Sequence, residues 1–368
     1  MTSHSDTAPL VLLCAGGTGG HLFPAESLAV VLEKRGATVD LATDARAAHF
    51  TFPARQMHLI PSATLRGRDP FSLARTLTLL ALGTMKAWAL IGRIRPAVVV
   101  GFGGYPTVPP LFAASLRGVP TVLHEQNGVM GRANRLLASR VTCIATGFRT
   151  LAKLDARLQG KINFTGNPVR PAVIAAATTP YVQPAANDSF RLLVFGGSQG
   201  AHVMAEIVPP AIERLSPELR ARLSLVQQVR AEDLDGVRAT YARLGVAAET
   251  APFFNDLPQR LAAAHLVVSR SGASTVAELS AIGRPAILVP LPHALDQDQF
   301  ANAGVLAEAG GAIRIAQADF TPQRLADEIT ALAAEPARLA AMAAAAKSAG
   351  TIDAAERLAD LVMKTAER

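Results

Sequence analysis

Three glycine-rich turns are the segments of this 368-residue sequence whose composition most directly suggests chemistry. They span residues 16–20 (GGTGG), 101–104 (GFGG) and 196–200 (GGSQG). A glycine turn before a helix can hold a phosphate, because the unpaired N–H groups of the helix N-terminus point at the anion and glycine lets the backbone approach it closely. A tight connection between a strand and a helix needs the same residues, so each turn alone leaves both interpretations open.

The spacing within these turns limits which phosphate-containing ligands they could bind. None is followed by Gly-Lys-Ser/Thr and none has Gly-x-Gly-x-x-Gly spacing, which disfavours kinases and nicotinamide enzymes. Residues 269–278 (SRSGASTVAE) add a strand end, a glycine and a helix predicted to begin near Thr275. Glu278 in that helix can accept hydrogen bonds from both hydroxyls of a ribose, or it can compensate the helix dipole. The backbone amides of this helix N-terminus can bind a pyrophosphate, and Glu278 can bind a ribose. This combination indicates a sugar nucleotide as the ligand.

His21 directly follows the first turn. A neutral imidazole can accept a hydroxyl proton at cytoplasmic pH, because its ordinary pKa of about 6.5 lies close to that pH. A histidine at a turn is also a common structural hydrogen-bonding group, and the residue alone does not decide between the two roles. Farther along, residues 296–302 (DQDQFAN) supply amides and carboxylates that suit sugar hydroxyls.

The elements that must position these residues form two similar series. Strands of the first series are predicted from apolar runs at 10–15, 38–43, 97–102, 121–126 and 141–146. A connection rich in Pro, Asn and Thr is predicted at 160–190, after which the strand–glycine–helix pattern returns. Strands of the second series are predicted from 190 onward and near 223–228, 266–270 and 286–290. The Ala-rich sequence from Thr321 onward predicts two or three surface helices.

Composition limits the class of protein. Half of the residues are hydrophobic and 18% are charged, and the length suits two domains. The net charge of +7 favours acidic partners, but no basic run interleaved with aromatic residues indicates nucleic acid. Cys14 and Cys143 lie in apolar runs, where a thiol behaves as a small hydrophobic group. Because the sequence opens without a cationic start and an apolar core, we expect it to remain in the cytoplasm.

Residues 72–94 form a long apolar segment that carries Arg75, Lys86 and Arg93. These charges disfavour a helix that crosses a membrane. Two interpretations stay open: a core helix with a basic solvent face, or an amphipathic helix that rests with Trp88 in the headgroup layer.

Seven motifs, in order along the chain, together resemble a known enzyme family. They are GGTGGHLFPA (16–25), GFGGYPT (101–107), HEQN (124–127), TGNPVR (165–170), GGSQGA (196–201), RSGASTVAE (270–278) and DQDQFANA (296–303). As a set they are similar to the family-28 glycosyltransferases that form lipid II in bacterial peptidoglycan synthesis, on which cell shape and division depend. The resemblance covers nearly the whole chain.

The resemblance implies an α/β chain with the GT-B fold, in which two Rossmann-like domains with parallel sheets face each other across a cleft. It implies an acceptor- and membrane-binding domain over 1–166, a UDP-GlcNAc-binding domain over 167–351, and a last helix at about 352–368 that packs back on the first domain. The implied reaction is the inverting transfer of GlcNAc from UDP-GlcNAc to the 4-hydroxyl of MurNAc in undecaprenyl-pyrophosphoryl-MurNAc-pentapeptide (lipid I).

Matching motifs carry the family's functional residues onto this sequence. The catalytic candidates are His21 as the base, Glu125 and Asn127. The acceptor-side candidates are Gly103, Gly104, Tyr105 and His124. The donor-binding candidates are Thr18, Gly19, Gly20, Asn127, Arg170, Ser198, Phe254, Ala273, Ser274, Thr275, Val276, Ala277, Glu278 and Gln299. Two departures leave the sugar contacts at 296–299 open: the segment from His293 to Asp296 is one residue longer than the family pattern, and Asp298 stands at an amide position.

Asp-x-Asp pairs, which bind a divalent metal in another class of glycosyltransferases, occur at 233–235 and 296–298. The first lies in a charged surface stretch and the second where the resembling family reads the sugar, so we expect no obligatory metal or other cofactor. Helix N-termini would stabilise the departing diphosphate instead. The expected partners are UDP-GlcNAc, lipid I, the anionic inner leaflet and other cell-wall synthesis proteins, with the chain peripheral on the cytoplasmic face of the inner membrane.

Three rival functions stay open at this point. A UDP-GlcNAc 2-epimerase of the same architecture would turn over UDP-GlcNAc without an acceptor. Another glycosyltransferase would build a glycolipid on diacylglycerol. A catalytically silent UDP-sugar-binding regulator would lose little when His21 is replaced.

Overall fold

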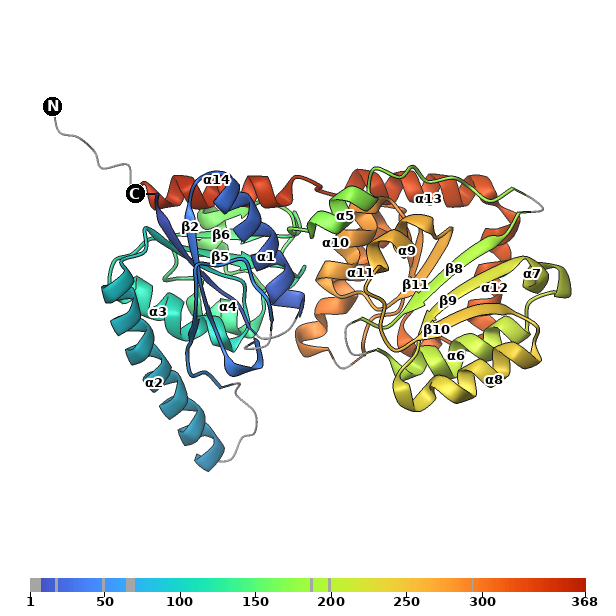
Figure 1. Ribbon diagram of the computed structural model, residues 1–368, viewed down its shortest axis with the longest axis horizontal. Helices are drawn as coiled ribbons and strands as arrows, with labels where there is room; N and C mark the ends of the chain where they lie inside the picture. Colours follow the sequence, from blue (N-terminus) through green and yellow to red (C-terminus); the bar gives the residue numbers. More distant parts are fainter. Residues whose placement is uncertain are drawn as a thin grey trace. The chain divides into compact units, whose positions relative to one another are not determined.

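The computed structural model describes residues 8–16, 19–47, 50–63, 70–185, 188–197, 200–292 and 294–368. The chain divides into two compact units (Figure 1). The first comprises Met1–Arg170 together with Ile352–Arg368, and the second comprises Pro171–Thr351. The division falls after residue 170, whereas the sequence analysis expects it after residue 166.

The first unit contains a seven-stranded parallel sheet in the order β3-β2-β1-β4-β5-β6-β7. Its strands are β1 (Leu10–Cys14), β2 (Thr38–Thr43), β3 (Gln56–Leu59), β4 (Val98–Gly101), β5 (Thr121–Glu125), β6 (Cys143–Thr146) and β7 (Ile162–Phe164). Its helices are α1 (Gly19–Lys34), α2 (Pro70–Ile94), α3 (Val108–Leu116), α4 (Arg132–Leu137) and α14 (Ala354–Ala366).

Both faces of this sheet are buried, which explains why its central strands are continuous apolar runs. Side chains alternate between the two faces along each strand. In β1, Val11 and Leu13 pack toward α1 and α14, and Leu12 and Cys14 pack toward α2, α3 and α4. Cys14 is thus an unpaired core residue, as the sequence predicts.

Helix α14 lies beside α1 although it comes from the far end of the chain (Figure 1). Leu358 and Val362 are fully buried in the core that α1 shares with the sheet. At the surface, Arg35 donates to Asp360 at 2.6 Å and also pairs with Glu356. The last helix therefore contributes to the core of the first unit.

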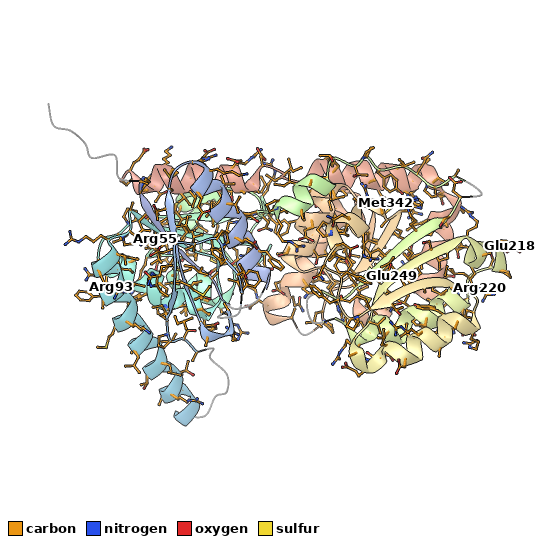
Figure 2. The ribbon with its side chains drawn as sticks, in the orientation of Figure 1. Arg55, Arg93, Glu218, Arg220, Glu249 and Met342 are labelled. Atoms are coloured by element: carbon orange, nitrogen blue, oxygen red, sulfur yellow. The ribbon has the colours of Figure 1, made fainter. Side chains whose placement is uncertain are left out.

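The second unit contains a six-stranded parallel sheet in the order β10-β9-β8-β11-β12-β13. Its strands are β8 (Phe190–Phe195), β9 (Leu223–Gln228), β10 (Ala247–Ala251), β11 (Leu266–Ser269), β12 (Ala286–Leu288) and β13 (Ala312–Arg314). Its helices are α5 (Pro171–Ala176), α6 (His202–Glu213), α7 (Pro217–Arg222), α8 (Leu234–Arg243), α9 (Leu257–Ala263), α10 (Ala273–Ile282), α11 (Asp298–Glu308), α12 (Pro322–Ala334) and α13 (Pro336–Ala349). One core joins the sheet to α6, α8, α12 and α13, and includes Met342, labelled in Figure 2.

In both sheets the strand order reverses at the centre. β1 and β4 are neighbours with later strands on either side, and β8 and β11 have the same relation in the second sheet. In parallel sheets, ligands bind beyond the carboxyl ends of the strands at this switch point. The turns at 16–20 and 101–104 follow β1 and β4, and the turn at 196–200 follows β8.

The structure corrects three expectations. The four outermost strands, β3, β7, β10 and β13, are not predicted from the sequence, and β7 lies inside the segment expected to be a connection. Helix α1 begins at Gly19, so the last two glycines of the turn at 16–20 lie within the helix rather than before it. The helices after Thr321 are three, but they are not merely superficial, because Leu325, Leu339 and Leu358 are fully buried.

We predict that Leu358→Ala destabilises the protein by about 2–5 kcal/mol, because it removes a buried side chain and leaves a cavity. Lys364→Ala, at an exposed position of the same helix, is the matched control and should stay within about 0.5 kcal/mol of the wild type. Urea unfolding measures both. Equal, small changes in the two variants would show that α14 adds nothing to the core.

Candidate active site

The turn after β1 leads directly into α1, and His21 lies in the first turn of that helix. An ideal Cβ built on Gly19 would lie 2.9 Å from the Phe23 ring, so close packing favours glycine there. An ideal Cβ built on Gly20 would meet nothing within 4 Å. Thr18, the third donor contact predicted in this turn, lies outside the described residues.

The His21 ring is held by residues that follow two neighbouring strands. Its Nδ1 lies 2.9 Å from Oε1 of Gln126, the residue after β5. Nε2 of Gln126 donates to the carbonyl oxygen of Phe102, the residue after β4, at 3.1 Å. The carboxyl ends of β1, β4 and β5 therefore meet at this imidazole.

Burial lowers the pKa of His21 below its ordinary value of 6.5, although hydrogen bonding to Gln126 and to the Phe102 backbone partly opposes this effect. The positive charge of Arg46 lowers the pKa of His21 as well. The N-terminus of α1, where the helix dipole is positive, also disfavours a cation. The ring is therefore neutral at neutral pH, which is the state a general base requires.

The second glycine turn faces the Cε1–Nε2 edge of the His21 ring. Gly103 and Gly104 have φ of +85° and +75°, which glycine adopts without strain. An ideal Cβ on Gly103 would lie 3.6 Å from Cε1 of His21, and one on Gly104 would lie 3.4 Å from Nε2. Tyr105 is partly buried and begins a short 3-10 turn, Tyr105–Thr107.

Glu125, predicted as a catalytic candidate, is a buried carboxylate whose two oxygens are both engaged. Oε1 accepts from the backbone N–H and the side-chain amide of Asn127 at 3.0 and 3.3 Å. Oε2 accepts from the N–H of Gly131 at 2.9 Å and from the amide of Asn134 at 2.7 Å. Burial raises the pKa of Glu125 and these four donors oppose that effect. The carboxylate holds Asn127 and the 127–134 segment in place.

His124 faces the opposite side of β5 and is fully buried against Phe102, with ring centroids 5.5 Å apart. Its Nε2 lies 3.2 Å from the carbonyl oxygen of Gly166, and its Nδ1 has no hydrogen-bond partner among the described residues. Burial lowers the pKa of His124 to about 4. His124, predicted as an acceptor-side contact, is thus a neutral, fully buried ring that packs against Phe102 and supports the end of β5.

Arg170, the last residue of the first unit, lies beside α1. Its guanidinium carbon is 4.6 Å from the centroid of the Phe23 ring, a cation–π contact. The predicted donor contacts Gly19 and Arg170 thus both lie against Phe23.

The second unit repeats the strand–glycine–helix arrangement after β8. Gly197 and Gly200 have φ of +89° and +68°, and the N–H of Gly196 donates to Oε1 of Gln228, the last residue of β9, at 3.1 Å. Helix α6 then begins at His202. Ser198, predicted to bind the donor, lies outside the described residues.

Helix α10 begins directly after the glycine that ends the turn following β11. Gly272 is its N-cap, and Ala273, Ser274 and Thr275 form a partly exposed first turn, in which the N–H groups lack intrahelical partners. Val276 and Glu278 are buried, whereas Ala277 is partly exposed. Because Glu278 lies in the second turn, beyond the reach of most of the dipole effect, dipole compensation does not explain this buried carboxylate.

Two further residues predicted to bind the donor follow other strands of the second unit. Phe254, after β10, is buried beneath the guanidinium of Arg260, which lies 4.3 Å from the ring centroid. Gln299, in the first turn of α11, accepts through Oε1 from the N–H of Leu291 at 3.1 Å. Asp296 and Gln297 before it have φ of +62° and +57°, a costly conformation for residues with side chains.

The two Asp-x-Asp pairs differ in their surroundings. Asp233 lies 2.9 Å from Nδ1 of His202 through one carboxylate oxygen. Burial and the neighbouring Asp296 raise the pKa of Asp298, whose Oδ1 accepts from the N–H of Gln299 at 2.7 Å. Among the residues that the structure describes, no three His, Cys, Asp or Glu side chains gather closely enough to hold a metal ion.

Sequence reasoning misses the buried amides that hold this site. Gln126, Asn134 and Asn167 hydrogen-bond to His21, to Glu125 and to the Gln126 carbonyl, respectively. Gln126 and Asn167 lie inside quoted motifs, which was the available signal. Their partners are distant in the sequence, so no local spacing could have paired them.

Comparison with known proteins gives two family matches, which together span most of the chain. Residues 11–146 match the glycosyltransferase family 28 N-terminal domain, and residues 191–358 match the family 28 C-terminal domain. A UDP-N-acetylglucosamine--N-acetylmuramyl-(pentapeptide) pyrophosphoryl-undecaprenol N-acetylglucosamine transferase from Rhodopseudomonas palustris is 64% identical over 98% of this chain and 99% of its own length. One of the same name from Nitrobacter hamburgensis is 62% identical, over 98% of each chain.

Solved structures share the architecture. MurG from Acinetobacter baumannii superposes with a TM-score of 0.77 at 28% identity, over 97% of this chain and 100% of that chain. A UDP-GlcNAc 2-epimerase from Neisseria meningitidis bound to UDP-GlcNAc superposes with a TM-score of 0.67 at 14% identity, over 96% and 100% of the two chains. The second likeness shows the fold alone.

We predict that Glu125→Gln destabilises the first unit by about 1–3 kcal/mol, because an amide places a donor where the carboxylate accepted from other donors, and leaves buried N–H groups unpaired. Glu33→Gln, at an exposed position of α1, is the control and should be neutral. Denaturant unfolding compares the two. A Glu125→Gln variant as stable as the control would contradict a holding role for this carboxylate.

Proposed function

This chain belongs to glycosyltransferase family 28, and we propose that it transfers GlcNAc from UDP-GlcNAc to the 4-hydroxyl of MurNAc in lipid I, giving lipid II. One arrangement carries this proposal: at the switch point of each sheet, a glycine turn leads to a helix N-terminus. In the first unit, the first turn of that helix contains the neutral histidine His21. Relatives more than 60% identical over nearly their full length bear the name of this reaction.

The second unit carries most of the donor-binding residues. The first turn of α10, Ala273 to Thr275, offers backbone N–H groups to the diphosphate, and the buried Glu278 accepts hydrogen bonds from the ribose. Phe254 lies beside the uracil, with contacts made largely through its backbone. Ser198 and Gln299 complete the set at the diphosphate and the sugar.

The first unit carries the base. His21 takes the proton of the MurNAc 4-hydroxyl, the hydroxyl oxygen forms a bond to C1 of GlcNAc, and the bond from C1 to the diphosphate oxygen breaks, which releases UDP. Attack opposite the leaving group inverts an α-linked donor to a β-1,4 product. Helix N-termini and Arg170 stabilise the charge that develops on the diphosphate, so the proposal includes no obligatory metal.

Helix α2 is the proposed contact with the anionic inner leaflet. Its inner face, with Gly83, Ala87 and Ile91, is buried against the first unit. Its outer face exposes five large apolar side chains: Leu73, Leu77, Leu82, Met85 and Trp88. Leu73–Ile94 is also long and apolar enough to cross a membrane, a property that core helices of other proteins share.

Cations surround this apolar face. Arg75, Lys86 and Arg93 are exposed on α2, with Arg93 labelled in Figure 2. The guanidinium carbon of Arg117 lies 3.8 Å from the centroid of the Trp88 ring. An exposed apolar patch with a tryptophan and a cationic border suits the headgroup layer of an anionic membrane, so this helix is both a core helix and a candidate membrane contact.

We predict that His21→Ala lowers the single-turnover rate with a lipid I analogue by about 10²–10⁴, the usual contribution of a general base, without a matching loss of UDP-GlcNAc affinity. Since the pKa of His21 is lowered below 6.5, the wild-type rate should fall as the base becomes protonated at acid pH, with the midpoint of that fall below pH 6.5. The measurements are the single-turnover rates of the wild type and of His21→Ala as a function of pH, together with the melting temperature of the variant. A near-wild-type rate, or a loss explained by unfolding, would remove His21 from the chemistry.

We predict that the triple variant Arg75→Gln, Lys86→Gln and Arg93→Gln loses affinity for anionic vesicles by about 1 kcal/mol per charge, while turnover of a soluble short-chain acceptor is retained. Arg243→Gln, Arg324→Gln and Arg338→Gln, at exposed positions of the second unit, make the same charge change elsewhere and form the control. Vesicle co-sedimentation measures both. Equal losses in the two triple variants would indicate a general charge effect and overturn the assignment to α2.

A further inference from the structure

Gln126 is a buried amide that joins three strand ends of the first unit. Its side chain is only 4% exposed. Nε2 donates to the Phe102 carbonyl at 3.1 Å, and Oε1 faces Nδ1 of His21 at 2.9 Å. Its own backbone carbonyl accepts from the amide of Asn167 at 2.8 Å. The side chain is therefore fixed in one orientation by buried hydrogen bonds, each of which costs about 1–3 kcal/mol when one partner is left unpaired.

The orientation of this amide determines which nitrogen of His21 carries the hydrogen. A primary amide donates at one end and accepts at the other. The Phe102 carbonyl can only accept, so the NH₂ group of Gln126 must face it and the amide oxygen must face His21. Because that oxygen can only accept, Nδ1 carries the hydrogen, and in the neutral ring Nε2 holds the lone pair.

Nε2 is also the nitrogen that lies toward the second glycine turn. An ideal Cβ on Gly104 would lie 3.4 Å from it, so a side chain there would crowd the nitrogen. The hydrogen bond between the ring and the Gln126 side chain is at Nδ1, on the side of the ring away from Nε2. The lone pair thus lies at the switch point of the first sheet, beside Gly103 and Gly104, which have no side chains to cover it.

We propose that Gln126 is a positioning residue for the transfer reaction: it fixes His21 in the Nδ1–H tautomer, so that Nε2 receives the proton of the acceptor hydroxyl. This inference rests on the proposed role of His21 as the base. The hydroxyl proton moves to Nε2, and the resulting imidazolium keeps its Nδ1–H on the amide oxygen of Gln126. A neutral amide orients the ring without the large rise in its pKa that a carboxylate would cause, so the base is still unprotonated at neutral pH.

The tautomer can be read without reference to activity. In ¹⁵N NMR spectra of histidine-labelled protein, with the His21 signals assigned by their absence in His21→Ala, we expect hydrogen on Nδ1 and a lone pair on Nε2. Gln126→Met removes the acceptor at similar size, so the Nδ1–H preference should be lost. Hydrogen on Nε2 in the neutral wild-type ring would overturn the proposal directly.

The pH–rate profile separates positioning from a merely structural role. Gln126→Glu keeps an acceptor at Nδ1 but adds a negative charge beside the ring, which raises the pKa of His21. Its acid limb should therefore move to higher pH, measured as the pH of half-maximal rate relative to the variant's own alkaline plateau. Gln126→Met should instead lose a large part of the about 10²–10⁴-fold contribution of the base at every pH. An unmoved acid limb in a folded Gln126→Glu variant would contradict the proposal.

A double-mutant cycle keeps the failure of this inference distinct from that of the proposed function. If Gln126 acts through His21, Gln126→Met should have no further effect in a His21→Ala background. Equal losses in both backgrounds would sink the positioning role, whereas a near-wild-type rate for His21→Ala alone would sink the base. Gln227→Met is the matched control, because that buried amide likewise donates to a carbonyl, Met204, and accepts from a side chain, Tyr241, but lies in the core of the second unit. It should lose stability without any shift of the pH profile.

Discussion

Parallel strands covered by helices on both faces leave one place where polar chemistry can reach solvent, the edge at which the strands end. In each unit the central strands are buried apolar runs, and the strand order reverses between β1 and β4 or between β8 and β11. The chain must turn away in opposite directions at that point, so successive loops diverge and helix N-termini point outward. The positions of the glycine turns, His21 and Glu278 all follow from this constraint.

Polar groups at such an edge are partly buried and must satisfy one another. Glu125 would be costly in an apolar interior, and four donors from the loop after β5 and from α4 stabilise its charge. Gln126 has the same kind of role toward His21, with a neutral group in place of a charged one. Two adjacent residues at the end of β5 thus have different roles: Glu125 holds the segment after the strand, and Gln126 orients the His21 ring.

The central strands and the site turns could be predicted from the sequence because their signals are local. A buried parallel strand is an apolar run, and a glycine turn before a helix is contiguous in the chain. The outermost strands could not be found in this way. β7 and β13 are only three residues long, and an edge strand has one neighbour and needs little apolar sequence. The role of Glu125 was also out of reach, because its burial and its bond to Asn134 depend on how α4 packs beside β5.

Enzymes with other reactions share this architecture, so the fold does not choose between transfer and epimerisation. The direct measurement of the central claim is the linkage of the product formed when the purified protein is incubated with UDP-GlcNAc and a lipid I analogue. The account predicts UDP release that requires the acceptor, together with a disaccharide in which GlcNAc is joined β-1,4 to MurNAc. Turnover of UDP-GlcNAc without acceptor, or the absence of that disaccharide, would contradict it.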